Sequence, residues 1–179
     1  MTLQLLGIEI MGNKLKLGIV VMAVAFFTVT NSPLNAQGVD RPFKGFANAV
    51  TNNFVFENPA PDLFEPENPN ELTILGYFDI QYVGRSTHLG KMTRQEYAVL
   101  YEDGSFEGLM IFVAANGDEL HATLDGSLDS LGPPTNGSGC YYFFGGTGRF
   151  ENATGITCFE LFTPDFNDVF VTFDGVVNY

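Results

Sequence analysis

Residues 116–128 read NGDELHATLDGSL and predict a hairpin turn followed by a strand. From Glu119 onward polar residues alternate with apolar or small ones, which places on one face Leu120, Ala122, Leu124, Gly126 and Leu128. The Asn-Gly-Asp run before the strand is typical of a tight turn, because asparagine and glycine readily adopt positive φ angles. A strand with one apolar face after such a turn indicates an antiparallel sheet that covers a core.

Seven further segments have the same extended character, and none shows a helical period. They are rich in Val, Thr, Phe and Tyr, which favour strands, and turn signals such as Asp103-Gly104 separate them. The eight predicted strands cover residues 43–50, 72–83, 86–101, 105–115, 119–128, 140–144, 155–162 and 169–177. Long Gly-rich antiparallel strands tend to close, because closure removes exposed sheet edges. We therefore expect an all-β, calycin-like, eight-stranded antiparallel barrel, with an interior that is filled by side chains or holds one small ligand.

Residues 1–36 have the features of a cleaved secretory signal peptide. Lys14 and Lys16 precede an uncharged run at residues 17–30, and residues 34–36 (LNA) provide a cleavage site. A membrane anchor is the alternative, but a spanning helix needs about 20 apolar residues and this run is shorter. We therefore expect a secreted or periplasmic protein, with disulfides allowed and no stable membrane insertion after cleavage.

The mature chain is expected to form a single domain over residues 37–179. Residues 37–71 comprise a first strand and an acidic loop rich in Pro and Asn, and residues 72–179 form the body of the barrel. Pro removes backbone donors and Asn favours turns, so the run at residues 57–71 is interpreted as a solvated surface loop. Calcium binding is the alternative for its carboxylates, but the regular D-x-D-x-D-G spacing is missing.

The composition excludes several classes of function. The 179 residues include 21 acidic and 8 basic ones, a formal net charge of −13, so nucleic acid is not an expected partner. The two Cys and two His lack the closely spaced pairs of a Cys/His zinc site, and we expect no metal and no cofactor. No nucleophile elbow or Ser/His/Asp pattern is present.

A glycine-rich string at residues 144–150 reads FGGTGRF. Because glycine adopts backbone angles closed to other residues, Gly145, Gly146, Thr147 and Gly148 predict a tight structural turn. We expect Arg149 to bond loop carbonyls there and Phe150 to plug the barrel end. A phosphate cradle is the alternative for a glycine-rich loop, but no helix and no Lys-Ser/Thr pair follow.

This string is followed by residues 153–155 (ATG), and residues 86–90 (STHLG), 114–118 (AANGD) and 173–175 (FDG) accompany it in order. Together they resemble the allene oxide cyclase and dirigent barrels, and most closely a family of exported bacterial proteins described as allene oxide cyclase barrel-like. The resemblance covers residues 76–179 and implies an eight-stranded barrel with an apolar cavity for a small apolar ligand. Plant members are often oligomeric, which implies a homo-oligomer. The plant cyclases rearrange a fatty-acid epoxide and dirigent proteins steer radical coupling, but their catalytic residues lie outside these strings and none is carried over.

The two cysteines, Cys140 and Cys158, lie symmetrically about residue 149 in the glycine-rich turn. In a hairpin with this centre they fall opposite each other, so a cross-strand disulfide is within reach. Export favours the disulfide, and two free buried thiols are the alternative.

The segment at residues 92–100 places Arg94 and Glu96 on the same face as three apolar residues. If this face points inward, the pair would line a cavity and could orient a ligand, although burial of such a pair is costly without good partners. The opposite face, from Thr93 to Tyr101, is the open alternative for the interior. Arg94 and Glu96 are therefore the candidate ligand-binding residues.

Three functions remain open at this point. The first is a secreted, soluble binding or structural module, which the absence of a catalytic constellation favours. The second is a cyclase or isomerase that positions a reactive apolar substrate, since such chemistry leaves little trace in a sequence. The third is a small outer-membrane barrel, indicated by the alternation at residues 169–177; the other strands lack a clean apolar band, and Trp is absent.

Overall fold

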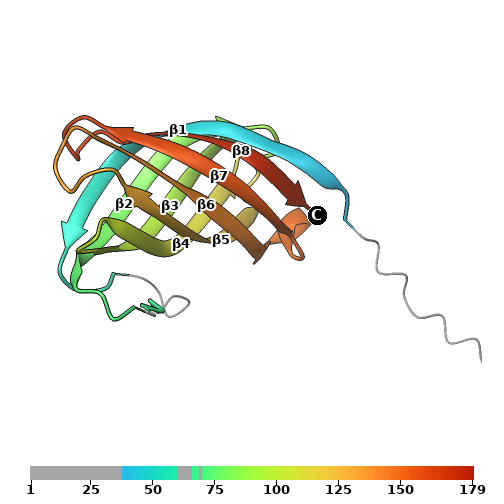
Figure 1. The fold of residues 1–179 in the computed structure, drawn as a ribbon. Coiled ribbons are helices and arrows are strands. Elements are labelled where there is room, and N and C mark those ends of the chain that lie inside the picture. The colour runs from blue at the N-terminus through green and yellow to red at the C-terminus, as the bar shows by residue number, and fades with distance from the viewer. Residues whose placement is uncertain (1–37, 60–65, 69) are drawn as a thin grey trace, which may run out of the picture. The chain divides into compact units, whose positions relative to one another are not determined.

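The computed structural model describes residues 38–59, 66–68 and 70–179, and they form a closed barrel of eight antiparallel strands (Figure 1). The strands are β1 (Asp40–Val55), β2 (Ile74–Ser86), β3 (Gly90–Tyr101), β4 (Ser105–Ala114), β5 (Glu119–Leu128), β6 (Thr135–Gly146), β7 (Thr154–Thr163) and β8 (Phe170–Asn178). Each strand pairs with the next, and β1 closes the barrel by pairing with β8. The predicted fold class is confirmed.

The predicted signal peptide, residues 1–36, lies outside the described residues. Within the described part of the chain, no helix has the length and apolar character needed to cross a membrane.

All eight predicted strands are present, and two of them begin four or five residues away from the expected start. The predicted segment 86–101 holds the last residue of β2, a turn, and then β3, because the chain reverses before Gly90, whose φ is +69°. Strand β6 begins at Thr135 rather than at Cys140. Gly137 and Gly139 lie in this part of the strand. Because glycine weakens a strand signal, residue propensities did not predict it.

Glycines on two neighbouring strands make room for aromatic rings inside the barrel. Phe106 pairs with Gly126, Gly126 with Gly139, and Gly139 with Phe159, across β4, β5, β6 and β7. The rings of Phe106 and Phe159 stack with centroids 6.2 Å apart. A Cβ on Gly126 would lie 2.6 Å from the Phe106 ring, and one on Gly139 would lie 2.7 Å from the Phe159 ring. Across these four strands the interior is therefore filled by alternating large and absent side chains at close packing.

One end of the barrel is closed by the short 3₁₀ turn η1 (Gly148–Phe150), which follows β6. Phe150 is fully buried, and Gly148 has a φ of +57° that favours glycine. Nη2 of Arg149 donates a hydrogen bond of 2.8 Å to the carbonyl of His88 in the turn between β2 and β3. This is the end at which β1 begins and β8 finishes (Figure 1).

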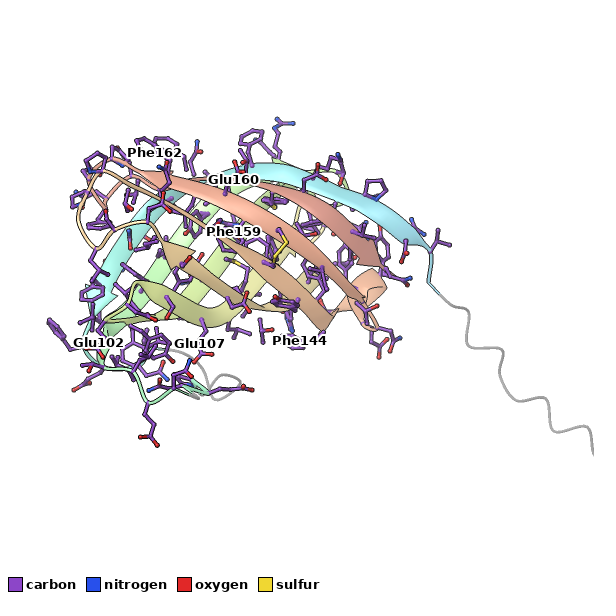
Figure 2. All side chains as sticks on the ribbon, in the orientation of Figure 1. Glu102, Glu107, Phe144, Phe159, Glu160 and Phe162 are labelled. Atoms are coloured by element: carbon purple, nitrogen blue, oxygen red, sulfur yellow. A yellow bond between two sulfur atoms is a disulfide. The ribbon has the colours of Figure 1, made fainter. Side chains whose placement is uncertain are left out.

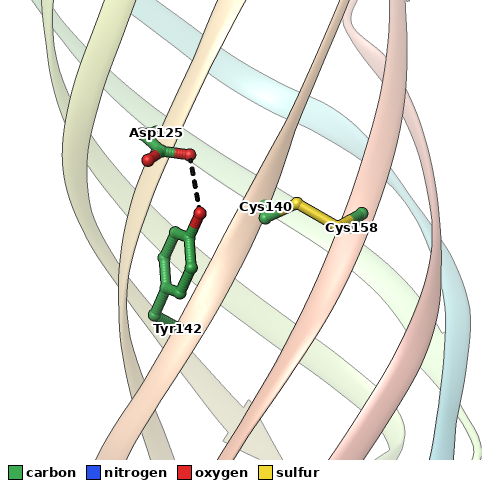
Figure 3. The surroundings of a disulfide bond; sticks show 4 residues. All are labelled: Asp125, Cys140, Tyr142 and Cys158. Carbon is green, nitrogen blue, oxygen red and sulfur yellow. Dashed lines mark hydrogen bonds between the residues drawn. A yellow bond between two sulfur atoms is a disulfide. The ribbon is translucent and has the colours of Figure 1, made fainter.

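Cys140 and Cys158 pair directly across β6 and β7 and form the predicted disulfide, which is confirmed (Figure 3). Beside it, the hydroxyl of Tyr142 donates a hydrogen bond of 3.3 Å to the carboxylate of Asp125 on β5. The neighbours of the two cysteines in sequence, Tyr141 and Phe159, are buried in the core. Because successive side chains of a strand alternate between faces, the disulfide lies on the outer face of the barrel.

Replacing both Cys140 and Cys158 with serine should lower the free energy of unfolding by about 3 kcal/mol and leave the fold unchanged. The disulfide closes a loop of 18 residues, and its loss frees the unfolded chain without opening a cavity. Urea unfolding followed by far-UV circular dichroism measures the difference. If the double variant lost its near-UV circular dichroism signal from aromatic residues in the absence of urea, a purely cross-linking role of the disulfide would be contradicted.

Candidate ligand site inside the barrel

Strand β3 holds Arg94 and Glu96 inside the barrel. Arg94 is 2% exposed and Glu96 is 9% exposed, whereas Thr93 on the same strand faces solvent. Of the two faces that the alternation left open, the one carrying the charged residues is therefore the inner face over this part of the strand. The surrounding interior is mostly aromatic and aliphatic, and Arg94 and Glu96 are the two acidic or basic residues among the buried residues of the described chain.

The guanidinium of Arg94 is held between two tyrosines. Its Nη1 donates a hydrogen bond of 2.7 Å to the hydroxyl of Tyr141, and its Cζ lies 3.9 Å from the centre of the Tyr82 ring. The second contact is a cation–π stack. Nε and Nη2 of Arg94 are buried without a hydrogen-bond partner. Since a guanidinium keeps its charge in proteins, the interior contains a permanent positive charge with unused hydrogen-bonding capacity.

Glu96 lies two residues further along β3, and its environment disfavours ionisation. Burial raises the pKa of its carboxyl group above the ordinary value of 4.5; the charge of Arg94 and a hydrogen bond with Tyr82 lower the pKa but do not cancel the effect of burial. Burial also raises the pKa of Tyr82 and of Tyr141, so both hydroxyls keep their protons. Among the ion pairs of the described residues, Arg94 and Glu96 form none with each other.

A cavity of about 40 Å³ adjoins this cluster. Glu96 and Tyr82 form one side of it, and the other lining residues are Asn52, Phe78, Ile80, Phe106, Leu128, Leu161, Thr163, Phe166 and Val169. Several of these residues stand at strand ends opposite η1, so the cavity lies toward the barrel end that η1 leaves open. A water molecule needs about 10–15 Å³ of such volume, which gives room for about three water-sized groups. That is the size of a polar head group with its first carbon.

Larger hollows, of about 460 to 600 Å³, lie on the outer face of the barrel. Glu160 and Phe162 on β7, labelled in Figure 2, line one of them. The buried charges of Arg94 and Glu96 border none of these hollows. The small interior cavity is therefore the better candidate for a site, because size without convergent polar groups does not give specific recognition.

Sequence reasoning did not single out Tyr82 and Tyr141. Tyr82 pairs directly with Arg94 across β2 and β3, and the turn before Gly90 fixes that register, so a hairpin argument could have found it. Tyr141 lies on β6, three strands away from β3, and only closure of the barrel brings its hydroxyl to Arg94. No local pattern in the sequence signals that contact.

The glycine-rich turn does not contribute to the cavity, since none of its residues is among the lining residues. Within residues 38–59, 66–68 and 70–179, no three His, Cys, Asp or Glu side chains gather closely enough to hold a metal ion. The site is thus a mixed one, with a buried cation, a carboxyl group and two phenols beside an apolar cavity.

Glu96→Gln should remove a pH dependence of stability. Burial raises the pKa of Glu96 in the folded chain, so the folded state binds this proton more tightly than the unfolded state does. The stabilisation is fully present below the unfolded pKa and is lost as the pH rises through the folded pKa. The wild type should therefore lose stability relative to Glu96→Gln as the pH rises from the ordinary value of 4.5 through the raised pKa of the folded chain. Urea unfolding of the wild type and of Glu96→Gln at several pH values measures this difference, with the exposed position Glu160→Gln as the control. A difference in stability between the wild type and Glu96→Gln that stays constant with pH would contradict the prediction.

Comparison with known proteins identifies a solved structure with a similar fold. No protein-family model matches the sequence, and no curated protein matches it. Among solved structures, the chain is similar to the pterocarpan synthase dirigent protein GePTS1, with a TM-score of 0.54 and 17% sequence identity over 88% of this chain and 99% of that chain. A likeness at this level of identity concerns the fold, and the described chain therefore has a dirigent-like barrel fold.

Proposed function

We propose that this chain is an exported small-molecule-binding barrel, whose cavity beside Glu96 holds the polar head of a ligand. The observation that carries the proposal is that Glu96 and Tyr82 line a cavity within an apolar core, with Arg94 and Tyr141 buried behind them in contact with Tyr82 or with each other. Burying charges is costly, so a barrel that needed only a core would be better served by apolar residues at these positions. The disulfide and the dirigent-like fold support export.

The apolar part of the ligand would lie among aromatic rings at the open end of the barrel. Phe78 and Phe166 line the cavity, and Phe54 packs against Phe78 with ring centroids 5.1 Å apart. Phe54 is 44% exposed, so part of this aromatic surface faces solvent at the mouth. Aromatic side chains bury much apolar area per residue, which favours a ligand with an apolar body and one polar end.

Binding of benzyl alcohol, followed by saturation-transfer NMR, tests this proposal. Ile80→Phe should weaken binding at least tenfold, because Ile80 is buried on the cavity wall and the larger side chain fills the space. Val83→Phe is the matched control, since Val83 lies on the same strand and is 46% exposed on the outer face. Absence of binding to the wild type, or equal loss in both variants, would contradict a site inside the barrel.

An isomerase-type enzyme is a second candidate, and the raised pKa of Glu96 beside the cavity favours it. A carboxyl group whose pKa moves toward neutral can both accept and donate protons. The carboxylate of Glu96 would take a proton from a ligand carbon, and the same proton would return to that carbon or to another. With cyclohexanone in D₂O, exchange of the α-hydrogens should be faster with the wild type than with Glu96→Gln. Equal rates would rule this chemistry out for such a carbon acid.

The outer face of the barrel argues against the membrane alternative. Lys44 and Asp174 form an ion pair of 2.7 Å across β1 and β8, and Asp125 and Glu160 are exposed within β5 and β7. Membrane barrels present an apolar band to lipid and have a polar interior. This barrel has charges on its outer face, and apart from the cluster at Arg94 and Glu96 its interior is mostly aromatic and aliphatic.

A further inference from the structure

The charges around the cavity identify a class of ligand. Arg94 is permanently charged, and the titratable groups that act on it and on Glu96 are Tyr82 and Tyr141. Because both tyrosines keep their protons, the charge of this interior cluster depends on Glu96 alone. The cluster is neutral when Glu96 is ionised and carries one positive charge when Glu96 is protonated.

We propose that the cavity takes a small carboxylic acid, which binds by sharing one proton with the carboxyl group of Glu96. The inference rests on the proposed function and adds the chemical class of the ligand. In the bound state one of the two carboxyl groups is ionised and the other is protonated, so that one negative charge balances Arg94. The proton forms the hydrogen bond between the two groups, and no covalent bond between heavy atoms is made or broken.

Proton uptake follows from the geometry of the cavity. Glu96 lines a space of about 40 Å³, so a second carboxylate that enters it must lie against the first. Two ionised carboxylates at such close range repel each other, and one of them binds a proton instead. At neutral pH the ligand carboxylate therefore enters together with one proton from solvent, which the raised pKa of Glu96 already favours.

Other head groups fit this site less well. An amine would bring a second positive charge into the interior that holds Arg94, whose Nε and Nη2 have no acceptor. An alcohol can bond to Glu96 or Tyr82 without proton uptake, so it cannot form the shared-proton pair between two carboxyl groups. A carboxylic acid is the head group that can share a proton with Glu96 while one negative charge remains in the interior that holds Arg94.

Three one-ring probes that differ in their head groups test the proposal on the full mature chain: benzoate, benzyl alcohol and benzylamine. At pH 5 benzoate should bind at least tenfold more tightly than benzylamine and more tightly than benzyl alcohol. At a pH at which both free carboxyl groups are ionised, calorimetry in two buffers of different ionisation enthalpy should show uptake of about one proton per benzoate. Over the range in which both free carboxyl groups are ionised, the affinity for benzoate should fall about tenfold per pH unit.

The variant Glu96→Gln tests whether Glu96 is the group that shares the proton with the ligand. The amide keeps the volume of the side chain but cannot titrate, so benzoate should bind to this variant without proton uptake. Glu160→Gln, an exposed position on β7, should behave as the wild type does. If Glu96→Gln fails to fold, proton uptake by the wild type decides the question.

The outcomes distinguish this inference from the proposed function. Uptake of one proton with benzoate and none with benzyl alcohol would support the carboxylic acid. Binding of benzyl alcohol at least as tight as that of benzoate, without any dependence on pH, would overturn the proposal of a carboxylic acid ligand. The proposed function as a small-molecule-binding barrel would be unaffected. Failure of all three probes to bind would overturn both.

Discussion

Arg94→Met should lower the free energy of unfolding by about 3–5 kcal/mol at pH 7, because it removes the charge that lowers the pKa of Glu96 inside the barrel. The substitution also leaves the hydroxyl of Tyr141 without its 2.7 Å donor. Without the cation, the pKa of Glu96 should rise further, so that the carboxyl group becomes neutral at mildly acidic pH. The loss of stability should therefore be smaller at pH 5 than at pH 7. Urea unfolding at both pH values measures it.

A double variant, Arg94→Met with Glu96→Leu, separates the cost of leaving one buried charge alone from the effect of removing both charged groups. Replacing a buried ion pair by apolar residues of similar volume is often neutral or stabilising, whereas removing one partner is strongly destabilising. The double variant should therefore be more stable than Arg94→Met alone, while binding of benzyl alcohol weakens. A double variant as unstable as the single one would contradict an electrostatic origin for the loss.

Gly139→Ala should lower the free energy of unfolding by about 3 kcal/mol, a large effect for one methyl group. A Cβ at this position would lie 2.0 Å from the carbonyl oxygen of Asp125 and 2.7 Å from the ring of Phe159. The first of these atoms belongs to the backbone of β5 and cannot move without breaking the pairing between β5 and β6.

The matched control for this substitution is Gly132→Ala, in the loop between β5 and β6. No atom lies within 4 Å of a Cβ at Gly132, so its replacement should change stability by less than about 0.5 kcal/mol. Thermal unfolding of both variants makes the comparison. If Gly139→Ala were as stable as Gly132→Ala, the aromatic rings would not be packed against the strands as tightly as the structure has them.

The strands and their order could be predicted from the sequence because both signals are local. Alternation within each segment marks a strand, and a turn signal such as Asn116-Gly117 fixes the antiparallel connection to the next strand. The disulfide followed from the same logic, since Cys140 and Cys158 lie at equal distances from one turn. Closure of the barrel needed a further step, the argument that unprotected edges are unfavourable.

The inner face of β3 could not be chosen from the sequence, and the structure gives the physical reason. Val99 and Tyr101, which lie on the other face from Arg94, are also buried, at 0% and 4% exposure. The segment after β1 lies against that outer face: the amide of Asn68 donates a hydrogen bond of 3.2 Å to the carboxylate of Glu107, which also accepts one from Tyr101. Figure 2 shows Glu107 beside this segment. A strand buried on both faces gives no clear alternation.

The contacts that complete the candidate site depend on distances around the barrel. Arg94 meets Tyr141 only because β3 and β6 face each other across the interior, and the sequence contains no signal for that separation. The cavity depends on how closely the rings of Phe78, Phe106 and Phe166 approach one another. Such packing is decided by side-chain shape in three dimensions.

Entry of a ligand into the barrel beside Glu96 is measured most directly by NMR, with the side-chain carboxyl groups labelled with ¹³C and the backbone amides with ¹⁵N during a titration with benzyl alcohol. The carboxyl signal of Glu96 and the amide signals of Ile80 and Thr163 should shift together and saturate, while that of Phe150 at the closed end stays in place. Shifts confined to outward residues such as Phe46 and Phe162, with Glu96 unmoved, would place binding on the outside of the barrel and contradict an interior site.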